Sequence, residues 1–141
     1  MSDNGSGVDV LSRTECLRLL ASAKVGRVVY TQGGLPAVTP VNFALDGTVV
    51  VFRTATGSRL ARATEGAVVA FEVDRIDEDS QRGWSVVVTG VAEPVGGTSE
   101  LLRVAQLGLV SWAGEERSHY VRIVPAVVTG RRVAVPSETM N

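Results

Sequence analysis

The chain has 141 residues, enough for one domain with a hydrophobic core and too few for two domains of ordinary size. Its 14 basic and 15 acidic residues leave a formal charge of -1 and are spread along the sequence, which argues against a nucleic-acid-binding surface because such a surface needs concentrated positive charge. The single Cys16 excludes an internal disulfide, and a lone His119 without a cysteine cluster excludes a zinc site of ordinary spacing.

Residues 1–10 are predicted to form a disordered N-terminal segment, because the first seven are small and polar. They have neither the basic region nor the apolar core of a signal peptide, and no later apolar run is long enough to span a bilayer. We therefore expect a soluble, cytoplasmic protein. A helix is predicted to begin at Ser12, because Ser12 and Glu15 form a capping box in which each side chain satisfies a backbone N–H group.

Six strands are predicted after this helix, in a chain rich in valine and glycine and poor in aromatic residues. The dipeptides Gly33-Gly34 and Asp46-Gly47 are turn signals that join the first three strands into a meander. Short helices are expected at residues 57–64 and 98–109. The predicted strands are residues 25–31, 35–45, 48–54, 67–73, 84–95 and 119–133. Because unpaired sheet edges favour aggregation, the antiparallel strands are expected to close into a small barrel.

A polar cluster follows the third predicted strand. Arg53 and Thr54 end this strand, Gly57 permits a tight turn, and Ser58 and Arg59 begin a helix. Backbone N–H groups at a helix N-terminus and arginine side chains both favour an anion, so the cluster is a candidate phosphate site. The same residues are equally typical of a capped helix with Ser58 as the N-cap and the arginines in solvent.

Catalytic residues cannot be assigned from motifs. The sequence has no nucleophile elbow, no phosphate-binding P-loop, no Rossmann glycine fingerprint and no His-Asp pair. Carboxylates gather between Glu72 and Asp79, but apart from Glu72 and Asp74 they lie in a loop in which Arg75 and Arg82 are interleaved. This composition is typical of a solvated turn, so no metal site is expected there.

The sequence from Ala23 to Val95 resembles the FMN-binding split barrels of the pyridoxamine phosphate oxidase-like superfamily, and it is especially similar to the small actinobacterial and nitroimidazole-reductase-like members. The matching segments are Pro36, Pro40-Val41-Asn42-Phe43, Phe52-Arg53-Thr54, Gly57-Ser58-Arg59-Leu60, residues 69–73 and residues 83–90. The C-terminal part, with Trp112 and residues 121–125, fits more loosely. The resemblance implies a mainly β fold, a six-stranded antiparallel split barrel with a few short helices. It also implies a single flavin-binding domain at residues 11–135 and a C-terminal tail at residues 136–141.

The resemblance further implies where a flavin binds. The implied residues are Arg53, Thr54, Ser58 and Arg59 for the phosphate, Pro40, Val41 and Asn42 for backbone contacts to the ring, and Trp84 and Ser85 approaching from the fifth strand. Trp84 is equally compatible with capping the barrel core. Family members are homodimers with the cofactor at the subunit interface, and Trp112 is the candidate to reach across. Arg59 stands where many relatives carry lysine, which replaces a point charge with a planar fork.

The implied function is that of an FMN-binding oxidoreductase acting on an unidentified small molecule, in which the flavin carries out hydride or electron transfer. One alternative is a deazaflavin-dependent reductase on the same fold, for which the candidate basic residues are Arg27, Arg53, Arg59 and Arg62. Another is a non-enzymatic protein that stores a flavin or binds haem, with His119 as the available axial ligand. Neither a membrane nor a nucleic acid is expected as a partner.

Overall fold

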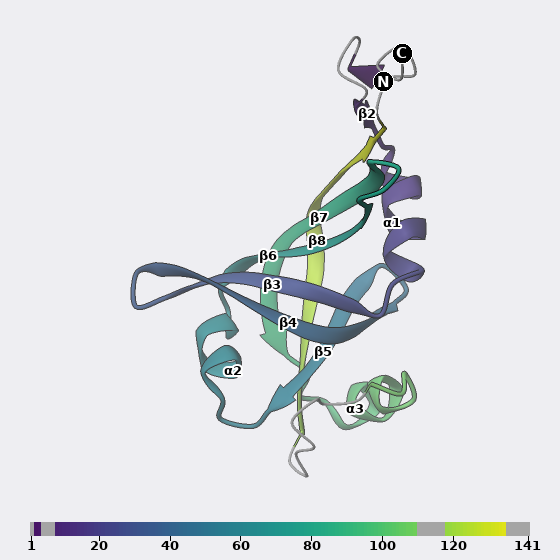
Figure 1. The fold of residues 1–141 in the computed structure, drawn as a ribbon. Coiled ribbons are helices and arrows are strands. Elements are labelled where there is room, and N and C mark those ends of the chain that lie inside the picture. The colour runs from purple at the N-terminus through teal and green to yellow at the C-terminus, as the bar shows by residue number, and fades with distance from the viewer. Residues whose placement is uncertain (1, 4–7, 110–117, 135–141) are drawn as a thin grey trace, which may run out of the picture.

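The predicted strands form a closed antiparallel ring in the structure, a computed structural model that describes residues 2–3, 8–109 and 118–134 (Figure 1). The ring strands are β3 (Val25–Gln32), β4 (Leu35–Asp46), β5 (Val49–Ala55), β6 (Val68–Asp77), β7 (Arg82–Pro94) and β8 (Ser118–Val133). Hydrogen-bonded neighbours follow the order β8-β5-β4-β3-β6-β7, and β7 pairs again with β8. The expected mainly β, six-stranded antiparallel barrel is confirmed.

Two further short strands, β1 (Ser2–Asp3) and β2 (Val8–Val10), extend the sheet beyond the ring. They lie in the segment for which the sequence predicts disorder. β2 pairs with residues 131–133 of β8, whose opposite edge pairs with β7. The alternation of Val8, Asp9 and Val10 suits a strand once such an edge is available. Local composition does not reveal the edge, because it is supplied by the far end of the chain.

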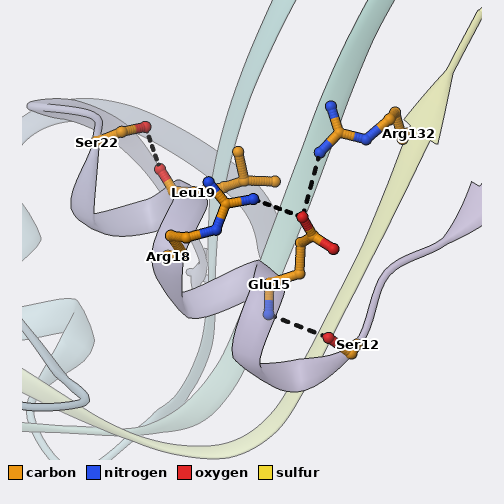
Figure 2. Close-up of polar contacts among 6 residues, drawn as sticks. All are labelled: Ser12, Glu15, Arg18, Leu19, Ser22 and Arg132. Atoms are coloured by element: carbon orange, nitrogen blue, oxygen red, sulfur yellow. Dashed lines mark hydrogen bonds and ion pairs between the residues drawn. The ribbon is translucent and has the colours of Figure 1, made fainter.

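Helix α1 (Arg13–Ala21) begins where the sequence predicts. Its N-cap Ser12 accepts a hydrogen bond from the backbone N–H of Glu15, with 3.1 Å between the nitrogen and Oγ. The Glu15 carboxylate contacts Arg18 of the same helix and Arg132 of β8 (Figure 2), so it ties the helix to the sheet. At the other end, Ser22 Oγ donates to the carbonyl oxygen of Leu19.

Helices α2 (Arg59–Thr64) and α3 (Thr98–Ala105) follow β5 and β7. Ser58 is the N-cap of α2. α3 ends short of the predicted residue 109, because Gln106 is its C-cap and Gly108 adopts a left-handed backbone with φ of 72°.

Large side chains fill the interior of the ring. Phe43 and Phe71 meet edge to face with ring centroids 4.8 Å apart. Gly26 faces the Phe71 ring so closely that a Cβ atom there would lie 2.3 Å from it, so only glycine fits without displacement. α1 adds the fully buried Cys16 and Leu20 to this core. A second, smaller cluster seats α3 and comprises Val51, Val95, Val104 and Leu109.

Candidate functional site

A pocket of about 720 Å³ lies along β4, the strand that pairs with β5, and we call it the β4–β5 pocket. Its walls come from the end of α1, from β4 and from the turn after α3, and they are mostly apolar. The lining residues are Leu20, Ala21, Ala23, Lys24, Asn42, Phe43, Ala44, Leu45, Leu107, Gly108 and Leu109. Among the implied site residues, the lining includes Asn42.

Arg53 of β5 lies beside Asn42 of β4. Phe43 of β4 pairs with Phe52 of β5, and extending the register by one pair places Asn42 next to Arg53. Arg53 Nη1 donates to the carbonyl oxygen of Leu109, which lines the pocket, over 2.7 Å. The guanidinium also lies 5.9 Å from the centroid of the Tyr120 ring. Asn42 therefore lines the pocket, and Arg53 is linked to its edge through Leu109.

The three β4 residues that the resemblance assigns to the flavin ring point to opposite faces of the strand. Val41 is buried in the barrel core with 5% exposure, whereas Pro40 and Asn42 point outward. Pro40 lines a second pocket of about 490 Å³ on the other side of β4. The two pockets share Ala23 and Lys24, so they flank the segment from Pro40 to Asn42. Val41 has only its backbone to offer a ligand there.

At the junction of β5 and α2 the structure contains a capped helix, which is one of the two interpretations that the sequence allowed. Ser58 Oγ accepts a hydrogen bond from the backbone N–H of Ala61 over 3.0 Å and lies 3.1 Å from Thr54 Oγ1. The Ser58 backbone N–H, expected to face an anion, donates instead to the carbonyl oxygen of Ala55. Arg59 is exposed. The junction retains a hydroxyl pair and a cation, with fewer amide donors than a phosphate loop.

Trp84 and Ser85 lie far from Arg53 and Thr54 within one chain. Thr54 pairs with His119 of β8, whereas Trp84 pairs with Arg132, thirteen residues further along that strand. At about 3.3 Å per residue, this separation is roughly 40 Å of strand. Trp84 is 8% exposed and packs in the barrel core, and Ser85 faces outward. Trp112, the remaining implied residue, lies outside the described residues.

An ion-pair cluster that the sequence does not predict lies on the outer face of the barrel. Arg27 of β3 pairs with Glu72 of β6, and its Nη1 lies 2.9 Å from Glu72 Oε1 and 3.2 Å from Asp74 Oδ2. Burial and the neighbouring Asp74 carboxylate raise the pKa of Glu72 from 4.5 to about 6, against the lowering effect of Arg27. The alternation of β6, with Val69, Phe71 and Val73 buried, is the sequence signal that assigns Glu72 and Asp74 to the outer face.

Between the Arg27–Glu72 pair and the Glu93–Arg122 pair, the outer surface of β3, β4, β6, β7 and β8 carries two rows of uncharged, mostly apolar residues. Cross-strand pairing aligns Val29, Ala70, Thr89 and Val127 in one row and Val68, Val91 and Val124 in another. Together with Val38, these residues form what we call the valine face. Val38, Val68, Val91, Val124 and Val127 are between 43% and 69% exposed. The next row contains Pro40, Arg27 and Glu72, so the valine face borders the second pocket.

The family model described as pyridoxamine 5'-phosphate oxidase matches residues 12–132. The chain belongs to this family. It is 40% identical over 134 residues to the Mycobacterium tuberculosis protein named Uncharacterized protein Rv0080, a match that covers 92% of this chain and 88% of that protein.

Two solved structures share the fold with substantial sequence identity. The FAD binding protein from Mycobacterium smegmatis is 39% identical with a TM-score of 0.77, covering 87% of this chain and 98% of the other. The conserved protein of unknown function DIP1874 from Corynebacterium diphtheriae is 37% identical with a TM-score of 0.77, covering 92% and 99%. Within the described residues, no helix has the length and apolar character needed to cross a membrane.

Proposed function

We propose that the chain binds a flavin nucleotide in the β4–β5 pocket and acts as a flavin-dependent oxidoreductase. The observation that carries the proposal is an apolar pocket of about 720 Å³, lined by Asn42 and by Leu109, to which Arg53 donates a hydrogen bond, in a chain of this family. Small-molecule sites commonly have volumes of about 300 to 1,000 Å³, with apolar walls and a few polar groups. The mycobacterial relative described as an FAD binding protein supports the same class of cofactor.

The side chains present suit a flavin. The leucines of the pocket match an aromatic ring system, and the Asn42 amide can both donate and accept hydrogen bonds. Arg53 uses Nη1 for Leu109, and a guanidinium has five N–H donors in the geometry that phosphate accepts. A bound flavin supplies hydride or electron transfer. The chain's own residues bind it, orient it and exclude water.

Within this proposal, each residue of the site is assigned to one part of the flavin. The ring is assigned to the backbone of Pro40, Val41 and Asn42, and the phosphate to Arg53, Thr54, Ser58 and Arg59. Trp84 and Ser85 of β7 pair with the far end of β8, which is too distant from this pocket for them to reach it in the same chain. They join the site only if a second subunit contributes them, which is also the expected role of Trp112.

We propose that the protein is a homodimer joined through the valine face. A charge-poor surface with several exposed valines is typical of a subunit interface. This face borders the second pocket, beside Pro40. A second subunit packed there would cover a ring lying against the outer face of β4.

The nature of the cofactor is tested first by the absorption spectrum of the purified protein. We expect the two visible bands of an oxidised flavin, and fluorescence titration of the cofactor-free protein should rank FMN against FAD. FMN is the cofactor implied by the resemblance, and FAD is the second candidate because of the mycobacterial relative. A deazaflavin or a haem spectrum, or no uptake of either flavin, would contradict the proposal.

Arg53→Gln tests the pocket directly. Because a hydrogen bond to a charged group contributes about 1.5 to 3 kcal/mol, we expect flavin affinity to fall by roughly 10- to 100-fold. Arg13→Gln is the matched control, since Arg13 is an exposed arginine at the start of α1. Thermal melting verifies that both variants fold. Equal flavin affinity for the two variants would exclude Arg53 from the site.

A further inference from the structure

The second pocket carries an excess of positive charge. It lies between the loop after α1, the start of β3 and the middle of β6, and we call it the basic pocket. Its lining residues are Ser22, Ala23, Lys24, Val25, Arg27, Pro40, Val73, Asp74 and Arg75. Three of these side chains are cationic, and Asp74 is the only carboxylate among them.

Among the described residues, two of the three cations have no counter-ion. Arg27 is held by Glu72 and Asp74. The side chains of Lys24 and Arg75, in contrast, have no hydrogen-bond or ion-pair partner within the part of the chain that the structure describes. Lys24 is also the only lysine among the 141 residues. Lys24 and Arg75 both line the hollow of about 490 Å³.

We propose that the basic pocket binds an anionic group, a carboxylate or a phosphate, of the substrate. The assignment to a substrate rests on the proposed flavin site, because the basic pocket shares Ala23 and Lys24 with the β4–β5 pocket and is lined by Pro40, which is assigned to the flavin ring. The phosphate end of the flavin is assigned to the junction of β5 and α2, on the other side of β4. If Lys24 and Arg75 bind the anionic group of the substrate, the rest of the substrate can extend toward the flavin ring.

The ion-pair cluster makes this binding dependent on pH. Glu72 faces Arg27 from β3 and Asp74 on its own strand, while its partner on β7 is the uncharged Val87. Lys24, from the loop after α1, and Arg75 are the other charged groups at the pocket. Because the pKa of Glu72 is near 6, its protonation at lower pH removes one negative charge beside Arg27 and raises the net positive charge at the basic pocket. Anion affinity should therefore rise as the pH falls through about 6.

The test uses Lys24 as a reporter. Reductive methylation with ¹³C-formaldehyde labels the single lysine and the N-terminal amine, and methylation keeps the charge. The flavin-free protein is titrated with succinate and with inorganic phosphate at constant ionic strength, with chloride as the reference anion. We expect a saturable change in the Lys24 signal, which weakens at least tenfold in Arg75→Ala. Arg82→Ala removes an exposed arginine outside the pocket and should leave the titration unchanged.

Lys24→Gln, followed by calorimetry, gives a second measure and should abolish the heat of anion binding. A Lys24 response that does not saturate, that chloride reproduces, or that Arg82→Ala weakens as much as Arg75→Ala overturns the proposal. A further arm compares protein loaded with FMN and with FAD. If FAD alone saturates the signal and excludes succinate, the anion belongs to the cofactor and the assignment to a substrate fails. Saturable succinate binding by a protein that takes up no flavin would instead overturn the proposed function and leave the anion site intact.

Discussion

Glu72 carries a carboxyl group whose ionisation the fold opposes. Burial is the largest cause and the adjacent Asp74 the next, while Arg27 offsets part of both. Because its pKa is raised from 4.5 to about 6, the folded protein binds this proton more tightly than the unfolded chain does. The resulting stabilisation is fully present below pH 4.5 and is lost as the pH rises through about 6.

Glu72→Gln should remove this dependence. Near pH 8 we expect the variant to be more stable than the wild type by about 1 kcal/mol, a value reduced for partial exposure to solvent. The difference should shrink as the pH falls and vanish below 4.5. Urea denaturation at several pH values measures it, with Glu78→Gln in the exposed β6–β7 turn as the control. A variant less stable than the wild type at every pH would mean that the Arg27 ion pair outweighs the burial cost.

At the scale of the element, α2 shows how one side chain can serve two purposes. Ser58 caps the helix through the backbone N–H of Ala61 and contacts Thr54. Ser58→Ala should therefore cost about 1 kcal/mol of stability, the usual cost of losing an N-cap. Ser58→Asp should restore the cap, because aspartate is an equally good N-cap residue. Denaturation curves of the two variants check this expectation.

The same pair of variants separates capping from cofactor binding. If Ser58 contacts a phosphate, Ser58→Asp should be as stable as the wild type and yet bind flavin more weakly than Ser58→Ala, because it places a carboxylate beside an anion. Unchanged flavin affinity for both variants would show that Ser58 serves the helix alone.

The local elements were predictable because their signals are local. Gly33, Gly34 and Gly47 adopt the positive φ values that the two hairpin turns require, and Ser12 and Ser58 cap their helices. The inward orientation of the Trp84 side chain could also be predicted from the sequence, since Trp84, Val86 and Val88 share one face of β7.

The remaining features depend on contacts that join distant parts of the chain. No local pattern reveals that β8 accepts β2, β5 and β7 along its length. The basic pocket is equally hidden, because the loop holding Lys24 meets Arg75 of β6 only once the barrel has closed. That Asn42 lies near Arg53 could be inferred from the sequence, because it follows from the register of two adjacent strands, although their role in binding a cofactor stays a prediction. The sequence could not place Trp84 relative to Arg53, because that relation depends on the long strand β8.

At the scale of the whole molecule, the valine face predicts the state of association. The wild type should sediment with twice the chain mass of 14.9 kDa. Val91→Glu should sediment as a monomer and bind flavin more weakly, because burying an unpaired carboxylate in an apolar interface is costly. Val10→Glu, at an exposed valine of β2 outside this face, is the control and should remain dimeric. A dimeric Val91→Glu protein, or a monomeric wild type that binds flavin, would contradict the proposed interface.

The long strand β8 also sets the order in which the chain can fold. The β3–β4–β5 meander and the β6–β7 hairpin use contacts between sequence neighbours and can form while the polypeptide is still being synthesised. The edges of β5 and β7 have no partner until residues 118–133 leave the ribosome. A nascent chain halted before that point exposes two unpaired strand edges, which are templates for aggregation. Cooperative folding therefore waits for β8, the last of the described strands along the sequence, which also pairs with β2.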